Sequence, residues 1–181
     1  MKKTVLTFGL ISGAVSSALM LLSVPLLNRI GFDRGAVLGY SGIVLSFLFV
    51  FFGVRSYREN VGHGAIGFGR ALAVGLLITL ISCVCYVATW EIIYFKLWPG
   101  FADQYSAFAM DKARASGASP QKLEETARQL ALFKDMYDKP LLNAAITLVE
   151  PLPIGLVVTF VSAGVLRRRP APAAAVPSAA R

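Results

Sequence analysis

The chain has 181 residues, of which 56% are hydrophobic and only 15% charged, and its formal net charge is +8 at pH 7. Soluble domains are nearer ~45–50% apolar and ~25% charged, so this composition argues against a soluble core and for lipid as the solvent. We expect the basic residues to contact a membrane surface and not to bind nucleic acid, because no nucleic-acid-binding fold is recognisable.

Four apolar runs divide the sequence, and each is long enough to cross a bilayer. A helix rises ~1.5 Å per residue through a hydrocarbon layer ~30 Å thick, so roughly 20 apolar residues suffice. We therefore predict an all-α polytopic membrane protein, a bundle of four transmembrane helices. The predicted spans are residues 4–27, 36–54, 71–95 and 141–166.

The first run also resembles a secretory signal, because Lys2 and Lys3 precede it. A cleaved signal usually has an apolar core of ~7–15 residues. This run continues without a charged residue through Leu27, so we expect it to be kept as a span.

Between the second and third runs, the stretch GHGAIGFGRA has the G-x-G-x-x-G spacing of a dinucleotide-binding turn. Such a turn follows a buried strand and needs an acid about 20 residues later in a βαβ unit. Here an apolar helix is expected before the glycines, and Ser82 and Cys83 stand at that distance after Gly62. We therefore expect no nucleotide.

These glycines belong to a wider pattern of small residues at every fourth position. Such stripes let helix backbones approach closely in lipid, where no hydrophobic force drives helices together. The pattern therefore predicts helix packing. The members are Gly67, Ala71, Gly75, Thr79 and Cys83 in span three, Gly9, Gly13 and Ser17 in span one, and two separate pairs in span two, Gly35 with Gly39 and Gly42 with Ser46.

The loop at residues 96–139 is predicted to contain two short amphipathic helices on or over the outer surface of the bundle. Gly117 separates two stretches with helical spacing of apolar residues. Ser119 can cap the second helix and Pro120 suits its first turn. The helices either form a contact surface or, as we favour, only cover the loop ends of the bundle.

The fourth run contains TLVEPLPIG, residues 147–155. Pro151 and Pro153 lack an amide hydrogen and so leave two carbonyl groups without helical donors. A break in the helix is therefore predicted, with Glu150 beside it. Such a break is tolerated in a membrane only where neighbouring groups or water satisfy the freed backbone.

Two hypotheses for Glu150 stay open, because an ionised carboxylate in lipid costs several kcal/mol unless it is protonated, paired or wet. In the first, Glu150 forms a proton or cation site with Glu91 of the third span as its partner, expected at a similar depth. In the second, a protonated Glu150 hydrogen-bonds Asn143, Thr147 or the freed carbonyls and fixes a kink.

Four crossings put both termini on one side of the membrane. Three arginines, 167–169, adjoin the last span, and the 55–70 loop is short, and basic residues at such positions favour the cytoplasmic side. We expect the termini and this loop to be cytoplasmic, against the anionic lipid of an inner membrane. The Pro/Ala-rich tail, residues 170–181, is predicted to be disordered.

Three segments carry a family resemblance: GVRSYREN at 53–60, GFGRALAVGLLITL at 67–80 and EPLPIGLVVTFVSAGVLRRR at 150–169. They resemble the bacterial membrane family catalogued as domain of unknown function 4199. The resemblance implies a four-span inner-membrane protein with a polar outer insertion, and it implies no activity. Its family-like positions include Glu150 and the pair Tyr57 and Arg58. Tyr57 and Arg58 are our candidates for a contact made by the cytoplasmic loop.

No serine–histidine–acid set, HExxH motif or metal-ligand spacing is present in the sequence. We therefore expect a non-enzymatic membrane component without a cofactor. It would pack with copies of itself or with a membrane-protein partner. The alternative is a small oligomeric carrier coupled to protons or ions through the intramembrane carboxylate. In either case anionic lipid is expected at the cytoplasmic face, and neither nucleic acid nor a nucleotide is expected as a ligand.

Overall fold

The structure is a computed structural model that describes residues 1–168, so the tail whose disorder we predict lies outside the described residues. The described part is built from helices, as the apolar runs predict. They are α1 (Lys2–Asn60), α2 (Phe68–Ile92), the short π-helix η1 (Ile93–Leu97), α3 (Phe101–Ala115), α4 (Pro120–Tyr137), α5 (Pro140–Val149) and α6 (Pro151–Leu166).

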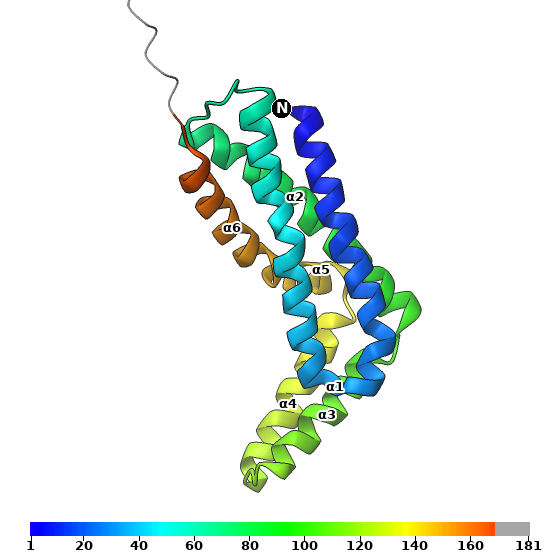
Figure 1. The fold of residues 1–181 in the computed structure, drawn as a ribbon. Helices are drawn as coiled ribbons and strands as arrows, with labels where there is room; N and C mark the ends of the chain where they lie inside the picture. Colours follow the sequence, from blue (N-terminus) through cyan, green and yellow to red (C-terminus); the bar gives the residue numbers. More distant parts are fainter. Residues whose placement is uncertain (169–181) are drawn as a thin grey trace, which may run out of the picture.

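Helix α1 is a hairpin and not a single rod. Gly31 has φ +79° and ψ 166° within it, a conformation that a side chain would strain. The chain reverses there, and Figure 1 shows the two arms, blue and cyan, side by side. The first arm is Lys2–Leu27 and the second arm is Arg29–Asn60. The turn predicted between the first two spans is therefore much tighter than the sequence suggested.

Four helical segments are long and apolar enough to cross a membrane: the two arms of α1, then Phe68–Leu97 and Pro140–Leu166. Each contains one of the predicted spans, so the prediction of an all-α fold with four apolar spans is confirmed. The chain is accordingly a multi-pass membrane protein.

Small residues let the helices of the bundle touch. A Cβ atom added to Gly13 would lie 2.6 Å from Cys85 Cβ of α2, and one added to Gly75 would lie 2.7 Å from Thr159 Cγ2 of α6. Thr79 and Thr159 share a hydrogen bond of 2.9 Å. The stripes of spans one and three therefore serve packing, and they are used within the chain.

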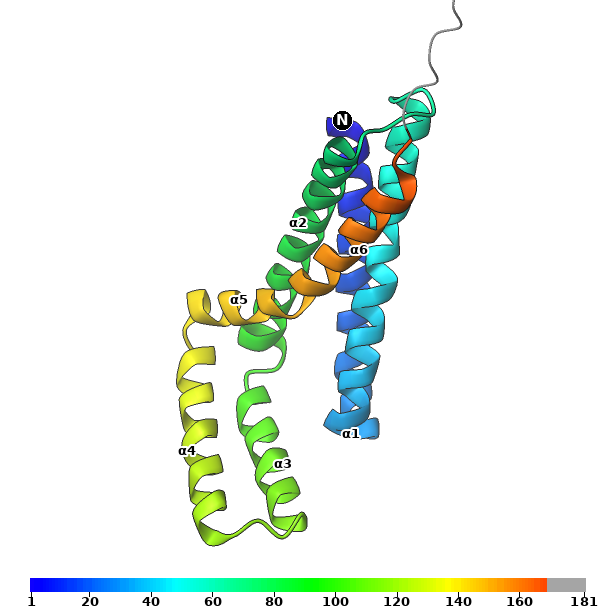
Figure 2. The same cartoon turned by 90° about the vertical axis from the view of Figure 1, so that its left-hand side faces the viewer.

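The fourth apolar segment is broken where the prolines predict, since α5 ends at Val149 and α6 begins at Pro151. Figure 2 shows α5 lying across the bundle while α6 runs from the break toward the end that holds the N-terminus. The segment is therefore not the straight rod that a 141–166 span suggests.

The two predicted short helices exist as α3 and α4. Gly117 has φ +75° between them, and the Ser119 hydroxyl accepts a bond of 3.3 Å from Lys122 N, with Pro120 in the first turn. Their orientation differs from helices that lie along a surface. Figure 2 shows them as an antiparallel pair that projects away from the level of α5, and not flat over the surface.

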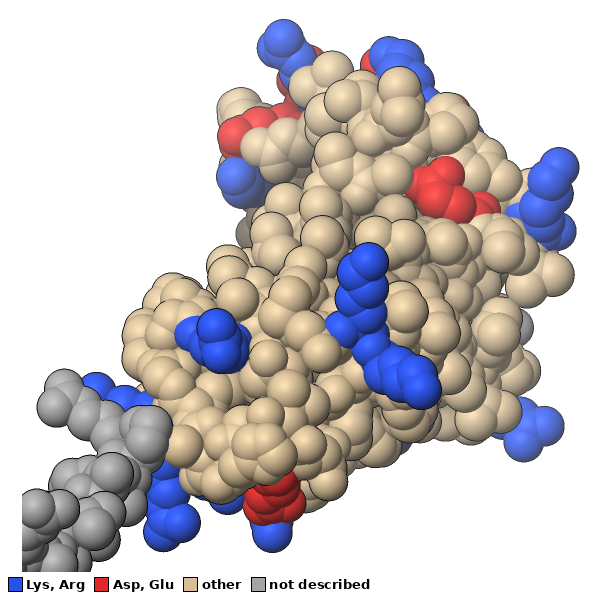
Figure 3. Space-filling model, turned by 90° about the horizontal axis from the view of Figure 1, so that it is seen from above, with Lys and Arg blue, Asp and Glu red and all other residues tan. Residues whose placement is uncertain are grey.

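The N-terminus, the loop before α2 and the end of α6 lie together at the opposite end of the bundle (Figures 1 and 2). Ile66 and Arg168 join the loop to the end of α6 by two backbone bonds of 3.0 and 2.9 Å. In Figure 3, which looks onto this end, Lys and Arg side chains are scattered over a mostly uncharged surface. We call this the basic end.

Candidate functional site

A cavity of about 620 Å³ lies between the two arms of α1, α2, the α3–α4 pair and the α5–α6 break. Its long walls are mainly leucines from both arms of α1, and Gly35 and Gly39 of the second arm also line it. Glycine has no side chain that could fill the cavity, so these two positions help to keep it open. The leucines are Leu19, Leu22, Leu26, Leu27, Leu38 and Leu45.

Aromatic side chains close the cavity toward the α3–α4 pair. Phe32, next to the turn of α1, packs against Phe101 and Tyr105 of α3, with ring centroids 5.9 and 5.6 Å apart. Tyr105 continues the contact to Phe133 of α4 at 5.5 Å. Lys112 of α3 also pairs with Asp33 at 2.6 Å. The projecting helices are thus fastened to the tip of the α1 hairpin.

The α5–α6 break presents one carboxylate to this cavity. Pro151 cannot donate to Thr147 O, and the Glu150 amide takes that acceptor instead at 3.3 Å. The chain therefore turns at Glu150, and Pro151 begins α6 as a buried residue while Pro153 is exposed. Glu150 itself is exposed and lines the cavity.

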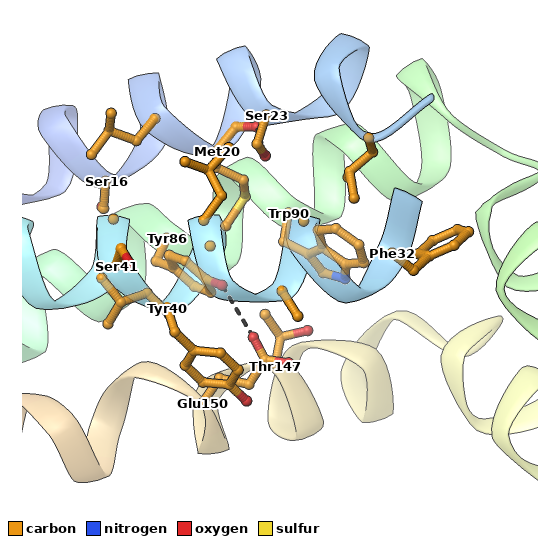
Figure 4. Close-up of a pocket in the computed structure, with 18 of the residues that line it drawn as sticks. Ser16, Met20, Ser23, Phe32, Tyr40, Ser41, Tyr86, Trp90, Thr147 and Glu150 are labelled. Carbon is orange, nitrogen blue, oxygen red and sulfur yellow. Dashed lines mark hydrogen bonds between the residues drawn. The ribbon is translucent and has the colours of Figure 1, made fainter. Parts of the chain in front are cut away.

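The Glu150 carboxylate accepts a hydrogen bond across the bundle. Tyr86 Oη of α2 donates to Glu150 Oε2 at 3.1 Å, the dashed line in Figure 4. In the same view Tyr40 reaches from the second arm of α1 toward the break, so a second phenol stands near the carboxylate. Among the described residues, no ion pair includes Glu150.

The comparisons with known proteins add one match. The family model described as "Protein of unknown function (DUF4199)" matches residues 7–168. The chain belongs to this family. No curated protein and no solved structure matches it. The resemblance stated from three segments of the sequence is therefore confirmed, and the family brings no activity with it.

In this DUF4199 chain, the polar residues expected to bind Glu150 bind each other. Thr147 Oγ1 donates to Asn143 Oδ1 at 3.1 Å, and Asn143 Nδ2 donates to Tyr137 O at 2.9 Å. These buried bonds fasten α5 to the end of α4. Neither residue hydrogen-bonds the Glu150 side chain, which bonds Tyr86 instead. The kink hypothesis predicted a bond from Glu150 across the bundle, and that bond exists with a different partner from those predicted.

Glu91 is not brought to Glu150. It stands five residues after Tyr86 on α2 and therefore points about 140° away from it around the helix. It is absent from the cavity lining, and its buried Oε1 atom has no hydrogen-bond partner among the described residues. The suggested carboxylate pair is not formed in this structure.

Tyr57 and Arg58 occupy the last turn of α1 at the basic end. The side chain of Tyr57 is 6% exposed and belongs to the buried core, so it does not offer a surface for a loop contact. Arg58 is partly buried: one guanidinium nitrogen donates to Glu59 at 3.2 Å, while Nε is buried without a partner among residues 1–168. The loop contact stays a prediction for Arg58.

Tyr86 is a site residue that was not predicted from the sequence. A helical spacing of four puts Tyr86 and Trp90 on one face of α2, and both line the cavity. A tyrosine deep in an apolar run needs a partner for its hydroxyl. That requirement, together with the search for a partner of Glu150, could have found the pair.

Proposed function

We propose that the protein is a non-enzymatic membrane protein that binds a small amphiphile in the cavity beside Glu150. The observation that carries the proposal is the cavity itself: about 620 Å³, mostly apolar walls, and one carboxylate at the helix break. Binding sites for small molecules are typically ~300–1,000 Å³, mainly apolar, with a few polar groups that orient the ligand.

The chemistry of the lining supports binding over catalysis. Its described polar side chains are hydroxyls of Ser, Thr and Tyr, the Trp90 indole and the Glu150 carboxylate. Nucleophilic catalysis needs a nucleophile held against a base, and the one histidine, His63, lies in the loop between α1 and α2 and not in the cavity lining. Within residues 1–168, no group of three His, Cys, Asp or Glu side chains suits a metal ion.

The packing also favours a small ligand over a second helix as the main binding partner. Gly13 and Gly75 contact α2 and α6 of the same chain, so these stripes offer no free groove. A homo-oligomer or a membrane-protein partner would use the exposed apolar faces instead. Crosslinking in intact membranes, followed by mass spectrometry, tests that further proposal.

We place the basic end in the cytoplasm of a cell with an inner membrane. The support is the short loop and the arginines that adjoin α6. Each basic residue at this end would contribute about 1 kcal/mol to binding of the anionic lipid surface. The cavity and the α3–α4 pair would then lie toward the outer side.

A second candidate is a proton- or ion-coupled carrier, which the exposure of Glu150 to the cavity favours. Ionisable residues inside membranes often mark transport paths. Proton uptake by proteoliposomes that contain the protein would support the carrier. Ligand binding without any proton or ion flux would support the simple binding protein.

The test of binding uses a cavity-filling variant. Gly39 lines the cavity, and a Cβ atom there meets nothing within 4 Å, so Gly39→Leu adds a side chain without a backbone clash. Gly164→Leu is the control, because Gly164 also has open space but lies in α6 outside the lining. Saturable quenching of Trp90 by a brominated amphiphile should be lost only in Gly39→Leu.

A further inference from the structure

The cavity holds an unbalanced charge. Among the described residues that line it, Glu150 is the single charged side chain, and no Lys or Arg stands with it. The ion pairs of the described chain lie elsewhere, at the basic end and on the α3–α4 pair or its contact with α1. The carboxylate therefore has no counter-charge of its own.

We propose that the ligand is a lipophilic ammonium, with its nitrogen against the Glu150 carboxylate and its apolar body along the leucine walls of α1. This inference rests on the proposed function and names the chemical class of its ligand. The ammonium would supply the positive charge that the lining lacks.

The hydrogen bonding around Glu150 leaves room for this nitrogen. Tyr86 donates to Oε2, and no described side chain donates to Oε1, which belongs to an exposed residue of the cavity. An ammonium group carries only donors, so it can bind the free oxygen directly. Hydrogen bonds to an ionised group are shorter and roughly twice as strong as bonds between neutral groups.

Aromatic rings around the carboxylate favour a cation further. Tyr40 and Tyr86 flank Glu150 in Figure 4, and Trp90 follows Tyr86 on the same face of α2. The face of an aromatic ring attracts a cation within ≈ 6 Å, most strongly where water is excluded. The leucines of both arms of α1 then receive the apolar part of the ligand.

Other ligand classes fit less well. An anionic amphiphile would bring a second negative charge to Glu150 without any base to offset it. A neutral one would bring no positive charge, so the Glu150 carboxylate would keep Tyr86 as its one described partner or take up a proton. The ammonium could come from a free lipophilic amine or from the headgroup of an aminophospholipid, and the chemistry at Glu150 is the same.

The chain offers a built-in reporter for the test. It has two tryptophans, and Trp90 lines the cavity while Trp98 does not. In a Trp98→Phe background, confirmed to be folded by thermal melting, the fluorescence of the full chain reports on Trp90. Bromine quenches tryptophan at short range, so three dodecyl probes brominated at the chain end suffice: an amine, an alcohol and a carboxylate, each added to protein in detergent at neutral pH.

The amine should bind about tenfold more tightly than the alcohol, as a hydrogen bond to a charged group predicts, and the carboxylate should bind weakest. Glu150→Gln should remove the preference of amine over alcohol. Should Glu150→Gln fail to fold, the order of the three probes on the wild-type chain, amine before alcohol before carboxylate, tests the proposal by itself. Gly39→Leu should weaken all three probes, and Gly164→Leu none.

The outcomes separate the two proposals. The ammonium proposal would be overturned if amine and alcohol bound equally, or if the carboxylate bound most tightly. The binding function would still stand if Gly39→Leu blocked that binding. The binding function itself would be overturned if saturable quenching were absent, or were the same in the Gly39→Leu variant and its Gly164→Leu control.

A last arm identifies the source of the ammonium. Vesicles of phosphatidylethanolamine with brominated acyl chains are compared with vesicles of phosphatidylglycerol brominated in the same way. Stronger quenching of Trp90 by phosphatidylethanolamine, relieved by free dodecylamine, supports a lipid headgroup as the ammonium. Equal quenching by both lipids, with saturable binding of the amine probe, supports a free amine.

Discussion

Tyr86 of α2 and Glu150 of the α5–α6 break are joined by a hydrogen bond of 3.1 Å, although they are far apart in the chain. The bond ties the third apolar span to the break in the fourth at the wall of the cavity. It satisfies a phenol that would otherwise lie unpaired in the bundle, and it orients the carboxylate.

The first prediction concerns the strength of this bond. Tyr86→Phe should destabilise the protein by about 0.6 kcal/mol and by no more than about 1.7 kcal/mol, the range found for polar side-chain pairs in membrane helices. Thermal unfolding in detergent measures the loss, and Tyr40→Phe is the control because the Tyr40 hydroxyl forms no hydrogen bond with the part of the chain that the structure describes. In a double-mutant cycle Glu150→Gln should couple to Tyr86→Phe and not to Tyr40→Phe. Equal coupling to both would contradict the bond.

The second prediction compares two glycines of α6. A Cβ atom on Gly155 would lie 2.4 Å from Thr79 Cγ2 and 2.9 Å from Phe47, whereas one on Gly164 meets nothing within 4 Å. Gly155→Ala should therefore cost about 1–3 kcal/mol through overpacking. Gly164→Ala should stabilise the helix by roughly 0.5–1 kcal/mol. The melting temperatures of the two variants test this, and similar values would show that α2 and α6 do not pack as described.

The sequence predicts the parts of this fold that depend on local composition. Long uncharged runs give the spans, Ser119 and Pro120 give the start of α4, and Pro151 gives the break at Glu150. It does not give Tyr86 as the partner of Glu150. That choice depends on the rotation and depth of α2 relative to α5, which hydrophobic periodicity does not fix.

The direction of α3 and α4 could not be predicted for a similar reason. Their amphipathic pattern identifies an apolar face but not what covers it. In the structure each helix covers the other, and Phe32 from the short turn of α1 fastens them. A single aromatic residue in a turn gives no periodic signal, so its role appears only in three dimensions.

The third prediction tests this fastening. Phe32 contacts four rings, those of Trp98, Phe101, Tyr105 and Phe108, and each aromatic pair contributes ~0.5–1.5 kcal/mol beyond its burial. Phe32→Ala should speed amide hydrogen exchange in α3 by at least about tenfold, through easier local opening. Phe52→Ala is the control, because Phe52 is 48% exposed and far from α3 in the chain. The same exchange rate in both variants would contradict the role of Phe32.

The fourth prediction concerns topology. Asn60 is the last residue of the second arm of α1, at the basic end, and Ser116 stands between α3 and α4; both are exposed. With Cys83 and Cys85 replaced by Ala, Ser116→Cys in sealed right-side-out vesicles should react with a membrane-impermeant maleimide. Asn60→Cys should react only after permeabilisation. The reverse pattern would contradict the proposed orientation and keep the fold, whereas labelling of both from one side would contradict the fold.

The last prediction concerns alkaline pH and Tyr137, the final residue of α4. Burial, and after it the negative charge of Glu150, raises the pKa of Tyr137 from 10.0 to about 12. The folded protein therefore keeps the phenol protonated where the unfolded chain has begun to lose the proton. Stability that depends on this difference is fully present below pH 10 and is lost as the pH rises toward 12.

Tyr137→Phe removes the titrating group and keeps most of the ring packing, so the melting temperature of the wild type should fall relative to this variant only as the pH rises above 10. Other groups titrate in both proteins and cancel in the difference. A gap that stays constant across this range would mean that Tyr137 ionises as freely in the folded protein as in the unfolded chain, and that neither burial nor the Glu150 charge acts on it.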